Sequence, residues 1–194
     1  ENWWVAIKGE QLTVMTPEGE IEPPLPALPG PHQLQNAGLA IVAMAALGDD
    51  RITRQAVAKG MSNVEWPARL QKLTRGPLIE KLPDNWELWL DGGHNPAAGK
   101  AIAATLKNWP GDAIEKPLHL ITGLINTKDP SGYLAPFKDH AETLTTVTIP
   151  GEEASISAED LSKIAGELGF AARPAQLVSD AIDQIRAEEK VPAR

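Results

Sequence analysis

The 194-residue sequence contains no cysteine, one tyrosine, two phenylalanines and three methionines. Without cysteine the chain has neither a disulfide framework nor a thiolate metal site, which fits a cytosolic protein. No apolar run reaches the roughly 18 residues that a membrane-spanning helix needs. The opening residues, ENWWVAIKGE, have neither the basic start nor the apolar core of a secretory signal. We therefore expect a cytoplasmic protein that does not bind membranes.

Basic residues are also scarce, since 18 Lys and Arg face 26 Asp and Glu and leave a net charge of −8. A general nucleic-acid binder needs a basic face, so this partner class is excluded, whereas a local pocket for one phosphate is not. The four histidines have no metal-ligand spacing, and we expect no metal site in this chain. Because the sequence begins with Glu1 and not with methionine, we expect it to be part of a longer polypeptide.

The pattern of the first third of the chain predicts two strands and two helices. Residues 3–21 predict two short strands. Five prolines between residues 23 and 31 predict an extended connector, because proline lacks the backbone N–H and fixes φ. An apolar helix over residues 33–47 follows, and a short helix over residues 53–59 ends at Gly60.

Beyond Trp66, apolar strands alternate with amphipathic helices. This alternation predicts an α/β fold, a Rossmann-like domain with a mostly parallel sheet. Such a chain would return to the sheet after its last helix, so we expect the final strand to be missing. The strands are expected to end at Leu90 and to cover residues 117–122, 144–149 and 175–178, and the helices to cover residues 96–108, 158–168 and 180–189.

The segment DGGHNP, which starts at Asp91, stands where a strand becomes a helix. Ligands of open α/β sheets bind at the carboxyl ends of the strands. Gly92 and Gly93 permit a tight turn, Asn95 is a favoured N-cap, and the helix N-terminus offers N–H groups to an anion. Asp91 would then bind a ribose hydroxyl or orient a cation, and His94 would contact a phosphate or nucleotide, or hold the loop. Equally, Asp91 and Asn95 would only cap the turn, because so short a motif is weak alone.

Four segments carry a more specific resemblance by their order along the chain. They are GPHQLQNAGLAIVAMAAL (30–47), WPARLQ (66–71), DGGHNP (91–96) and TGLINTKDP (122–130). In this order they resemble the folate branch of the Mur-ligase superfamily, and the chain looks like the C-terminal part of a bifunctional dihydrofolate synthase/folylpolyglutamate synthase. The resemblance implies that residues 1–64 end the central ATPase domain and that residues 65–194 form the C-terminal domain, without its last strand.

The resemblance implies an ATP-dependent amide ligase. ATP phosphorylates a carboxylate of dihydropteroate or a folate, and the amine of L-glutamate attacks the acyl phosphate, so that phosphate leaves and an amide forms. The phosphate-binding loop and the ligands of Mg²⁺ would lie upstream of this chain. We therefore expect the chain to be inactive alone, to need the rest of its own central domain, and to belong to a monomer.

The resemblance also assigns residues to the ATP site. Asn36 would contact the nucleotide, Arg69 a phosphate and Asp91 the ribose, with His94 at the same site. A guanidinium suits this role because its fork of donors matches a phosphate. Ala68 replaces the glycine that the family has before this arginine.

The resemblance implies a catalytic set of His94, Lys128 and Asp129. The family has an acid where Thr127 stands, so this part of the site departs from the family pattern. As an alternative, Lys128 and Asp129 form only a surface turn before Pro130.

Two other functions remain open. Cell-wall Mur ligases and cyanophycin synthetases share the wider plan, although the former usually carry a different sequence around this histidine. The other alternative is a nucleotide-binding or scaffold module that has no catalytic activity.

Overall fold

The computed structural model describes residues 3–8, 11–16, 19–107, 109 and 116–194. The chain divides into two compact units, Glu1–Arg69 and Leu70–Arg194, and each is described by itself. Within the described ranges, no helix is both long enough and apolar enough to cross a lipid bilayer.

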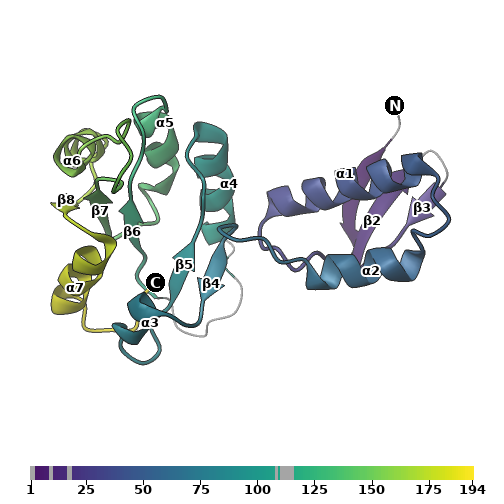
Figure 1. Ribbon diagram of the computed structural model, residues 1–194, viewed down its shortest axis with the longest axis horizontal. Coiled ribbons are helices and arrows are strands. Elements are labelled where there is room, and N and C mark those ends of the chain that lie inside the picture. The colour runs from purple at the N-terminus through teal and green to yellow at the C-terminus, as the bar shows by residue number, and fades with distance from the viewer. Residues whose placement is uncertain (1–2, 9–10, 17–18, 108, 110–115) are drawn as a thin grey trace. The chain divides into compact units, whose positions relative to one another are not determined.

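The first unit contains a three-stranded antiparallel sheet and two helices (Figure 1). The central strand places Val14 opposite Val5 on one side and opposite Ile21 on the other. Leu12 and Val14 are fully buried in an apolar cluster that also holds Ile41. The elements are β1 (Trp4–Lys8), β2 (Gln11–Thr16), β3 (Gly19–Ile21), α1 (Pro31–Leu47) and α2 (Arg54–Asn63).

Two boundaries in this unit were predicted wrongly. Helix α1 begins at Pro31, inside the expected connector, because proline is well tolerated at the first helical position. Helix α2 continues through Gly60 to Asn63. The buried side chain of Met61 joins the apolar cluster of this unit and so holds the last turn in helical form.

The second unit contains an antiparallel strand pair and a three-stranded parallel sheet with helices on both faces. Parallel pairing places Leu120 opposite Leu144, and Leu144 opposite Ala172. The strands are β4 (Gln71–Leu73), β5 (Leu88–Leu90), β6 (His119–Thr122), β7 (Thr143–Val147) and β8 (Ala172–Ala175). The helices are α3 (Pro77–Glu80), α4 (Pro96–Lys107), α5 (Pro130–Leu134), the 3-10 turn η1 (Ala135–Phe137), α6 (Ala158–Glu167) and α7 (Val178–Glu188).

The last strand of this sheet was predicted three residues too late, at 175–178. It lies at Ala172–Ala175, at the edge of the sheet, where Pro174 is tolerated because an edge strand does not need every N–H. Arg173 is accommodated because it forms an ion pair with Glu188 of α7. Asn108, the expected last residue of helix 96–108, lies outside the described residues.

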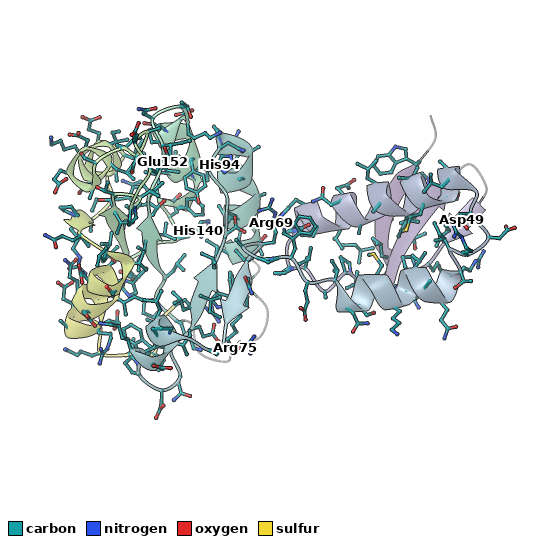
Figure 2. All side chains as sticks on the ribbon, viewed as in Figure 1. Asp49, Arg69, Arg75, His94, His140 and Glu152 are labelled. Carbon is teal, nitrogen blue, oxygen red and sulfur yellow. The ribbon has the colours of Figure 1, made fainter. Side chains whose placement is uncertain are left out.

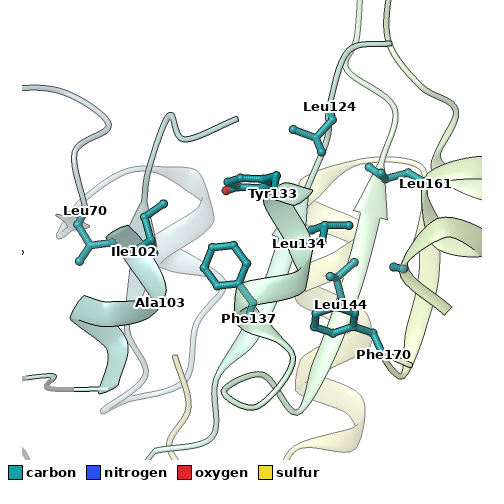
Figure 3. Close-up of a cluster of buried hydrophobic side chains, with 11 residues drawn as sticks. Leu70, Ile102, Ala103, Leu124, Tyr133, Leu134, Phe137, Leu144, Leu161 and Phe170 are labelled. Carbon is teal, nitrogen blue, oxygen red and sulfur yellow. The ribbon is translucent and has the colours of Figure 1, made fainter. Parts of the chain in front are cut away.

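The main core of the second unit lies between the sheet and helices α4, α5 and α6 (Figure 3). Tyr133 and Phe137 pack edge to face with ring centroids 5.4 Å apart. Close packing reaches the backbone at Gly99 of α4, where a Cβ atom would lie 2.3 Å from the carbonyl oxygen of Tyr133. The buried residues of this cluster are Leu70, Ile102, Ala103, Leu124, Tyr133, Leu134, Phe137, Leu144, Leu161, Ala165 and Phe170.

Glu87, just before β5, is the centre of a charged cluster. Its carboxylate accepts hydrogen bonds from Lys72 at 2.8 Å, from Arg194 at 2.8 Å and from the indole of Trp89 at 3.1 Å. Lys116 lies 3.2 Å away, and the Glu87 side chain is only 11% exposed. Burial alone would raise the pKa of Glu87, but the donors on Lys72, Arg194, Trp89 and Lys116 outweigh burial and hold the pKa far below its ordinary value.

This cluster makes stability depend on pH in the acid range. The folded-state pKa of Glu87 lies below the ordinary value of 4.5, so its contribution is complete above that pH and is lost as the pH falls toward the folded-state pKa. We expect Glu87→Gln to lower the free energy of unfolding by about 1–3 kcal/mol at pH 7 and by less below about pH 4. Urea unfolding of both proteins across this range measures the difference. Glu167→Gln, at the exposed end of α6, is the control, and equal losses for the two variants would contradict the prediction.

The close approach of α4 to α5 gives a second prediction. Gly99→Ala would press a methyl group against the carbonyl of Tyr133, so we expect a loss of about 1–3 kcal/mol in the free energy of unfolding. The matched control is Gly166→Ala in α6, where a Cβ atom meets nothing within 4 Å. Alanine there should stabilise the protein by about 0.4–1 kcal/mol, because it restricts the unfolded chain. Two changes of the same sign in thermal unfolding would show that the contact is not as tight as described.

Candidate functional site

The carboxylate of Asp91, directly after β5, joins two segments of the second unit. Its Oδ1 accepts a hydrogen bond from the backbone N–H of Gly93 at 2.6 Å, and its Oδ2 accepts one from Leu70 at 2.8 Å. An ionised carboxylate has about four lone-pair directions, so two remain for a further donor. Asp91 therefore holds the loop in shape and still has capacity for a ribose hydroxyl.

The rest of the DGGHNP loop leads into α4. The side chain of Asn95 accepts a hydrogen bond from the N–H of Ala98 at 2.9 Å and so caps the helix. His94 is exposed on this loop (Figure 2), and its Nδ1 lies 2.9 Å from the carbonyl oxygen of Gly92. Since a carbonyl only accepts, Nδ1 is the donor of this hydrogen bond, which leaves Nε2 directed away from it. A Cβ atom on Gly93 would lie 2.8 Å from Cδ1 of Ile102. The loop packs this closely on α4 because Gly93 has no side chain.

A second loop, which follows β6, carries the other candidate residues. Asp129 caps α5, since its Oδ1 accepts a hydrogen bond from the N–H of Gly132 at 2.9 Å. The backbone N–H of Lys128 bonds to the carbonyl of Ile125 at 3.1 Å, which makes the turn before the helix. Lys128 is half-buried and Asp129 is exposed. Thr127, in place of the family's acid, is exposed on the same turn.

The two loops lie side by side. A Cβ atom on Gly132 would come within 2.8 Å of Cγ of Pro96, so the first turns of α4 and α5 are in contact. Both loops follow the carboxyl ends of their strands, which is where open α/β sheets bind ligands. The fold therefore brings Asp91, His94 and Asn95 into the same region as Lys128 and Asp129.

Tyr133 is a residue of this region that the sequence did not point to. Burial, and to a smaller extent the negative charge of Asp91, raise the pKa of Tyr133 to about 12. Its hydroxyl is therefore protonated at neutral pH and does not serve as a general base. No spacing signal marked this residue, because it approaches Asp91 only through the packing of α5 on α4.

Arg69 lies in an unusual stretch of backbone at the end of the first unit. Its neighbours Ala68 and Leu70 have φ of 54° and 45°, in the left-handed region that favours glycine. The Arg69 guanidinium is exposed (Figure 2), and its Nη1 donates to the carbonyl of Ala68 at 3.2 Å. The glycine of the family's motif thus corresponds to a position where the backbone itself prefers glycine. Asp91 holds the N–H of Leu70 and so fixes the residue that follows Arg69.

Asn36 lies on the first turns of α1 and belongs to a short chain of side-chain hydrogen bonds. Its amide donates to Oε1 of Gln33 at 3.0 Å, and Nε2 of Gln33 lies 2.9 Å from Nε2 of His32. Gln33 is buried, so it fixes the position of Asn36 from the inside while Asn36 stays exposed. Asn36 and Arg69 are part of the first unit, and their roles toward a nucleotide stay predictions.

The described ranges contain no group of three His, Asp or Glu side chains that is arranged to hold a metal ion. In the second unit, the carboxylate of Asp91 and the N-terminus of α4 are of a kind that suits a nucleotide. In the first unit, the exposed guanidinium of Arg69 is of a kind that suits a phosphate.

No protein-family model matches the chain. A dihydrofolate synthase/folylpolyglutamate synthase of Mycobacterium tuberculosis is 29% identical over 188 residues, which are 92% of this chain and 35% of that protein. A solved structure of Mycobacterium tuberculosis folylpolyglutamate synthase complexed with ADP has a TM-score of 0.72 and 26% identity, and covers 96% of this chain and 39% of that one. The predicted resemblance is confirmed. The predicted α/β fold class is confirmed by the same structure.

The chain spans 19% to 35% of the length of the first curated relatives that it matches. The folylpolyglutamate synthases among them are enzymes, and the similarity to them covers nearly the whole chain. A UDP-N-acetylmuramoyl-L-alanyl-D-glutamate--2,6-diaminopimelate ligase of Corynebacterium efficiens is 34% identical over 100 residues, which are 51% of this chain and 17% of that ligase. The similarity to folylpolyglutamate synthases thus extends over more of the chain than the similarity to this diaminopimelate ligase.

The backbone beside Arg69 generates a prediction on stability. Ala68→Gly relieves a backbone strain of about 1–2 kcal/mol that the left-handed conformation costs alanine. Glycine also makes the unfolded chain more flexible, which costs about 0.5–1 kcal/mol on folding. We therefore expect the free energy of unfolding to rise by about 0.5 kcal/mol. The control is Ala40→Gly in α1 of the same unit, which should lower stability by about 1 kcal/mol. Urea unfolding at neutral pH distinguishes the two signs. If both variants lose the same free energy, the left-handed conformation at Ala68 is not present in solution.

Proposed function

We propose that this chain is the C-terminal part of an ATP-dependent ligase that adds L-glutamate to dihydropteroate and to folates. The reaction passes through an acyl phosphate on the pterin substrate, which the amine of glutamate attacks. The single observation that carries the proposal is the similarity to folylpolyglutamate synthases over nearly the whole chain, with the DGGHNP loop at the carboxyl end of β5.

The residues of the two loops have distinct tasks in this reaction. Asp91 accepts a hydrogen bond from a ribose hydroxyl with its remaining lone pairs, and the N–H groups at the N-terminus of α4 stabilise negative charge on the ligand. Nε2 of His94 and the ammonium of Lys128 orient the reacting groups, and Asp129 keeps α5 and its loop in position. These tasks require positioning and charge stabilisation, which are the main sources of rate in such transfers.

The first unit contributes two further groups to the proposed ATP site. The guanidinium of Arg69 binds a phosphate, and the amide of Asn36 contacts the nucleotide. Mg²⁺ neutralises phosphate charge when it is bound, and we assign its ligands to a part of the enzyme outside this chain. We therefore propose that the chain is inactive alone and acts with the rest of its central domain, as a monomer in the cytoplasm.

A second candidate function has a specific observation in its favour. The similarity to a diaminopimelate-adding ligase reaches 34% identity over half of the chain. The alternative substrates are therefore a UDP-muramoyl dipeptide and diaminopimelate in place of a pterin and glutamate.

The deciding experiment measures phosphate release from ATP by the protein of the complete reading frame and by residues 1–194. Each is assayed with L-glutamate plus dihydropteroate, with L-glutamate plus tetrahydrofolate, and with diaminopimelate plus the UDP-muramoyl dipeptide. We expect glutamate-dependent turnover with a pterin, by the complete protein only. Turnover with the muramoyl substrate alone would favour the cell-wall function, and no turnover with any substrate would favour a non-catalytic module.

Arg69→Ala in the complete protein tests the phosphate contact. Loss of a charge-assisted hydrogen bond worth about 1.5–3 kcal/mol should lower kcat/KM for ATP by about 10- to 100-fold. Arg75→Ala is the matched control, because Arg75 is also an exposed arginine (Figure 2) and lies a few residues further along the chain. Equal effects of the two substitutions would show that Arg69 does not contact ATP.

A further inference from the structure

Tyr133, the only tyrosine of the chain, is fixed in the core of the second unit. The residue is only 8% exposed, and its ring packs edge to face on Phe137 with ring centroids 5.4 Å apart. Its backbone lies against α4, where a Cβ atom on Gly99 would come within 2.3 Å of the Tyr133 carbonyl oxygen. The packing therefore gives the ring one orientation and its hydroxyl one direction.

The hydroxyl of Tyr133 is directed toward the loop that carries Asp91. Figure 3 shows its oxygen pointing toward Leu70 and Ile102. The N–H of Leu70 donates to Oδ2 of Asp91 at 2.8 Å. Cδ1 of Ile102 lies 2.8 Å from where a Cβ atom on Gly93 would stand, and the N–H of Gly93 donates to Oδ1 of Asp91 at 2.6 Å. Leu70 and Ile102 thus flank the carboxylate that the Tyr133 hydroxyl faces.

Among the described residues, this hydroxyl has no hydrogen-bond partner. Removing a hydroxyl from water without a partner is costly, and buried polar groups are therefore nearly always hydrogen-bonded. A phenylalanine would fill almost the same volume without this cost. The hydroxyl of Tyr133 therefore points to a partner on a ligand that binds beside Asp91.

Tyr133 and Asp91 offer complementary hydrogen-bonding groups. Burial, and to a smaller extent the charge of Asp91, raise the pKa of Tyr133 to about 12, so its hydroxyl keeps its hydrogen at neutral pH. The carboxylate of Asp91 only accepts, and about two of its lone-pair directions remain. An alcohol uses both groups at once, because its hydrogen goes to Asp91 and its oxygen accepts from Tyr133. A phosphate oxygen would be repelled by Asp91, and an ammonium would leave the hydrogen of Tyr133 without an acceptor.

We propose that Tyr133 is a specificity-determining residue of the nucleotide site, and that its hydroxyl donates to the ribose hydroxyl whose hydrogen Asp91 accepts. This inference rests on the proposed function, which assigns the ribose to Asp91. A site built to bond a ligand hydroxyl rejects the analogue that lacks it, because the analogue leaves buried polar groups unpaired. The protein therefore selects ribonucleotides over deoxyribonucleotides.

Calorimetric titration of the complete protein with ADP, 2′-deoxy-ADP and 3′-deoxy-ADP tests this assignment. Tyr133→Phe removes only the donor, so we expect Kd for ADP to rise about 3- to 10-fold, the loss of one hydrogen bond between uncharged groups. For the analogue that lacks the contacted hydroxyl, the wild-type protein and the variant should have equal Kd values. An equal rise for all three nucleotides, or an unchanged Kd for ADP, would overturn the proposal.

Thermal unfolding without nucleotide tests whether the hydroxyl has a partner inside the protein. Tyr133→Phe should leave Tm within about 1 °C of the wild-type value. Thr146→Val is the matched control, because Thr146 is also buried and its hydroxyl donates to the carbonyl of Ala158 at 2.6 Å. It should lower Tm by about 2–4 °C and leave the nucleotide preference unchanged. A similar fall for Tyr133→Phe would show that the hydroxyl bonds within the protein, which contradicts the proposal.

These titrations need neither a pterin nor glutamate, so they separate this inference from the proposed ligase activity. A complete protein that binds ADP but forms no amide would refute the ligase and leave the result on Tyr133 standing. In an active ligase, Tyr133→Phe should raise KM for ATP by about 3- to 10-fold with little change in kcat, because the ribose is remote from the transferred phosphate. A complete protein that binds none of the three nucleotides would overturn both proposals.

Discussion

The two hydrogen bonds of the Asp91 carboxylate hold the candidate site together. One fixes the loop that leads into α4, and the other fixes Leu70, where the second unit begins. Leu70 has a left-handed backbone that a bulky residue does not adopt without support, and a charge-assisted hydrogen bond supplies that support. Asp91, which the resemblance assigns to nucleotide binding, therefore also stabilises the loop that carries it. The two interpretations of the DGGHNP segment, ligand binding and turn capping, are compatible because a carboxylate has more acceptor capacity than the loop uses.

The sequence predicted those parts of the fold that depend on local pattern. Alternating strands and helices, the cap at Asn95 and the helix after it follow from residues close together in the chain. The strand at Ala172–Ala175 was misplaced because Arg173 and Pro174 look unsuitable for a strand until Glu188 and the edge position are known. The short elements β3, β4, α3 and α5 have too few residues to show a period.

The same distinction applies to the candidate site. Asp91, His94 and Asn95 are adjacent in sequence and were found together, whereas the contact of Asp91 with Leu70 spans 21 positions and gave no local signal. The raised pKa of Tyr133 and the contact between Pro96 and Gly132 arise only when α4 packs on α5. The structure adds most to the interpretation of Ala68. The sequence shows only that it stands where the family has glycine, and the structure shows that its φ is positive, a conformation that favours glycine.

The spacing of β5 and β6 has consequences for the site. Strand β5 carries the Asp91 loop and β6 carries the Lys128–Asp129 turn, and no ladder joins the two strands in the part of the chain that the structure describes. Their spacing there depends on the packing of α4 against α5 and on the contacts of Ala193 and Arg194. The relative position of the two loops therefore depends on this packing, and positioning errors of about 1 Å already cost a large share of rate in an enzyme.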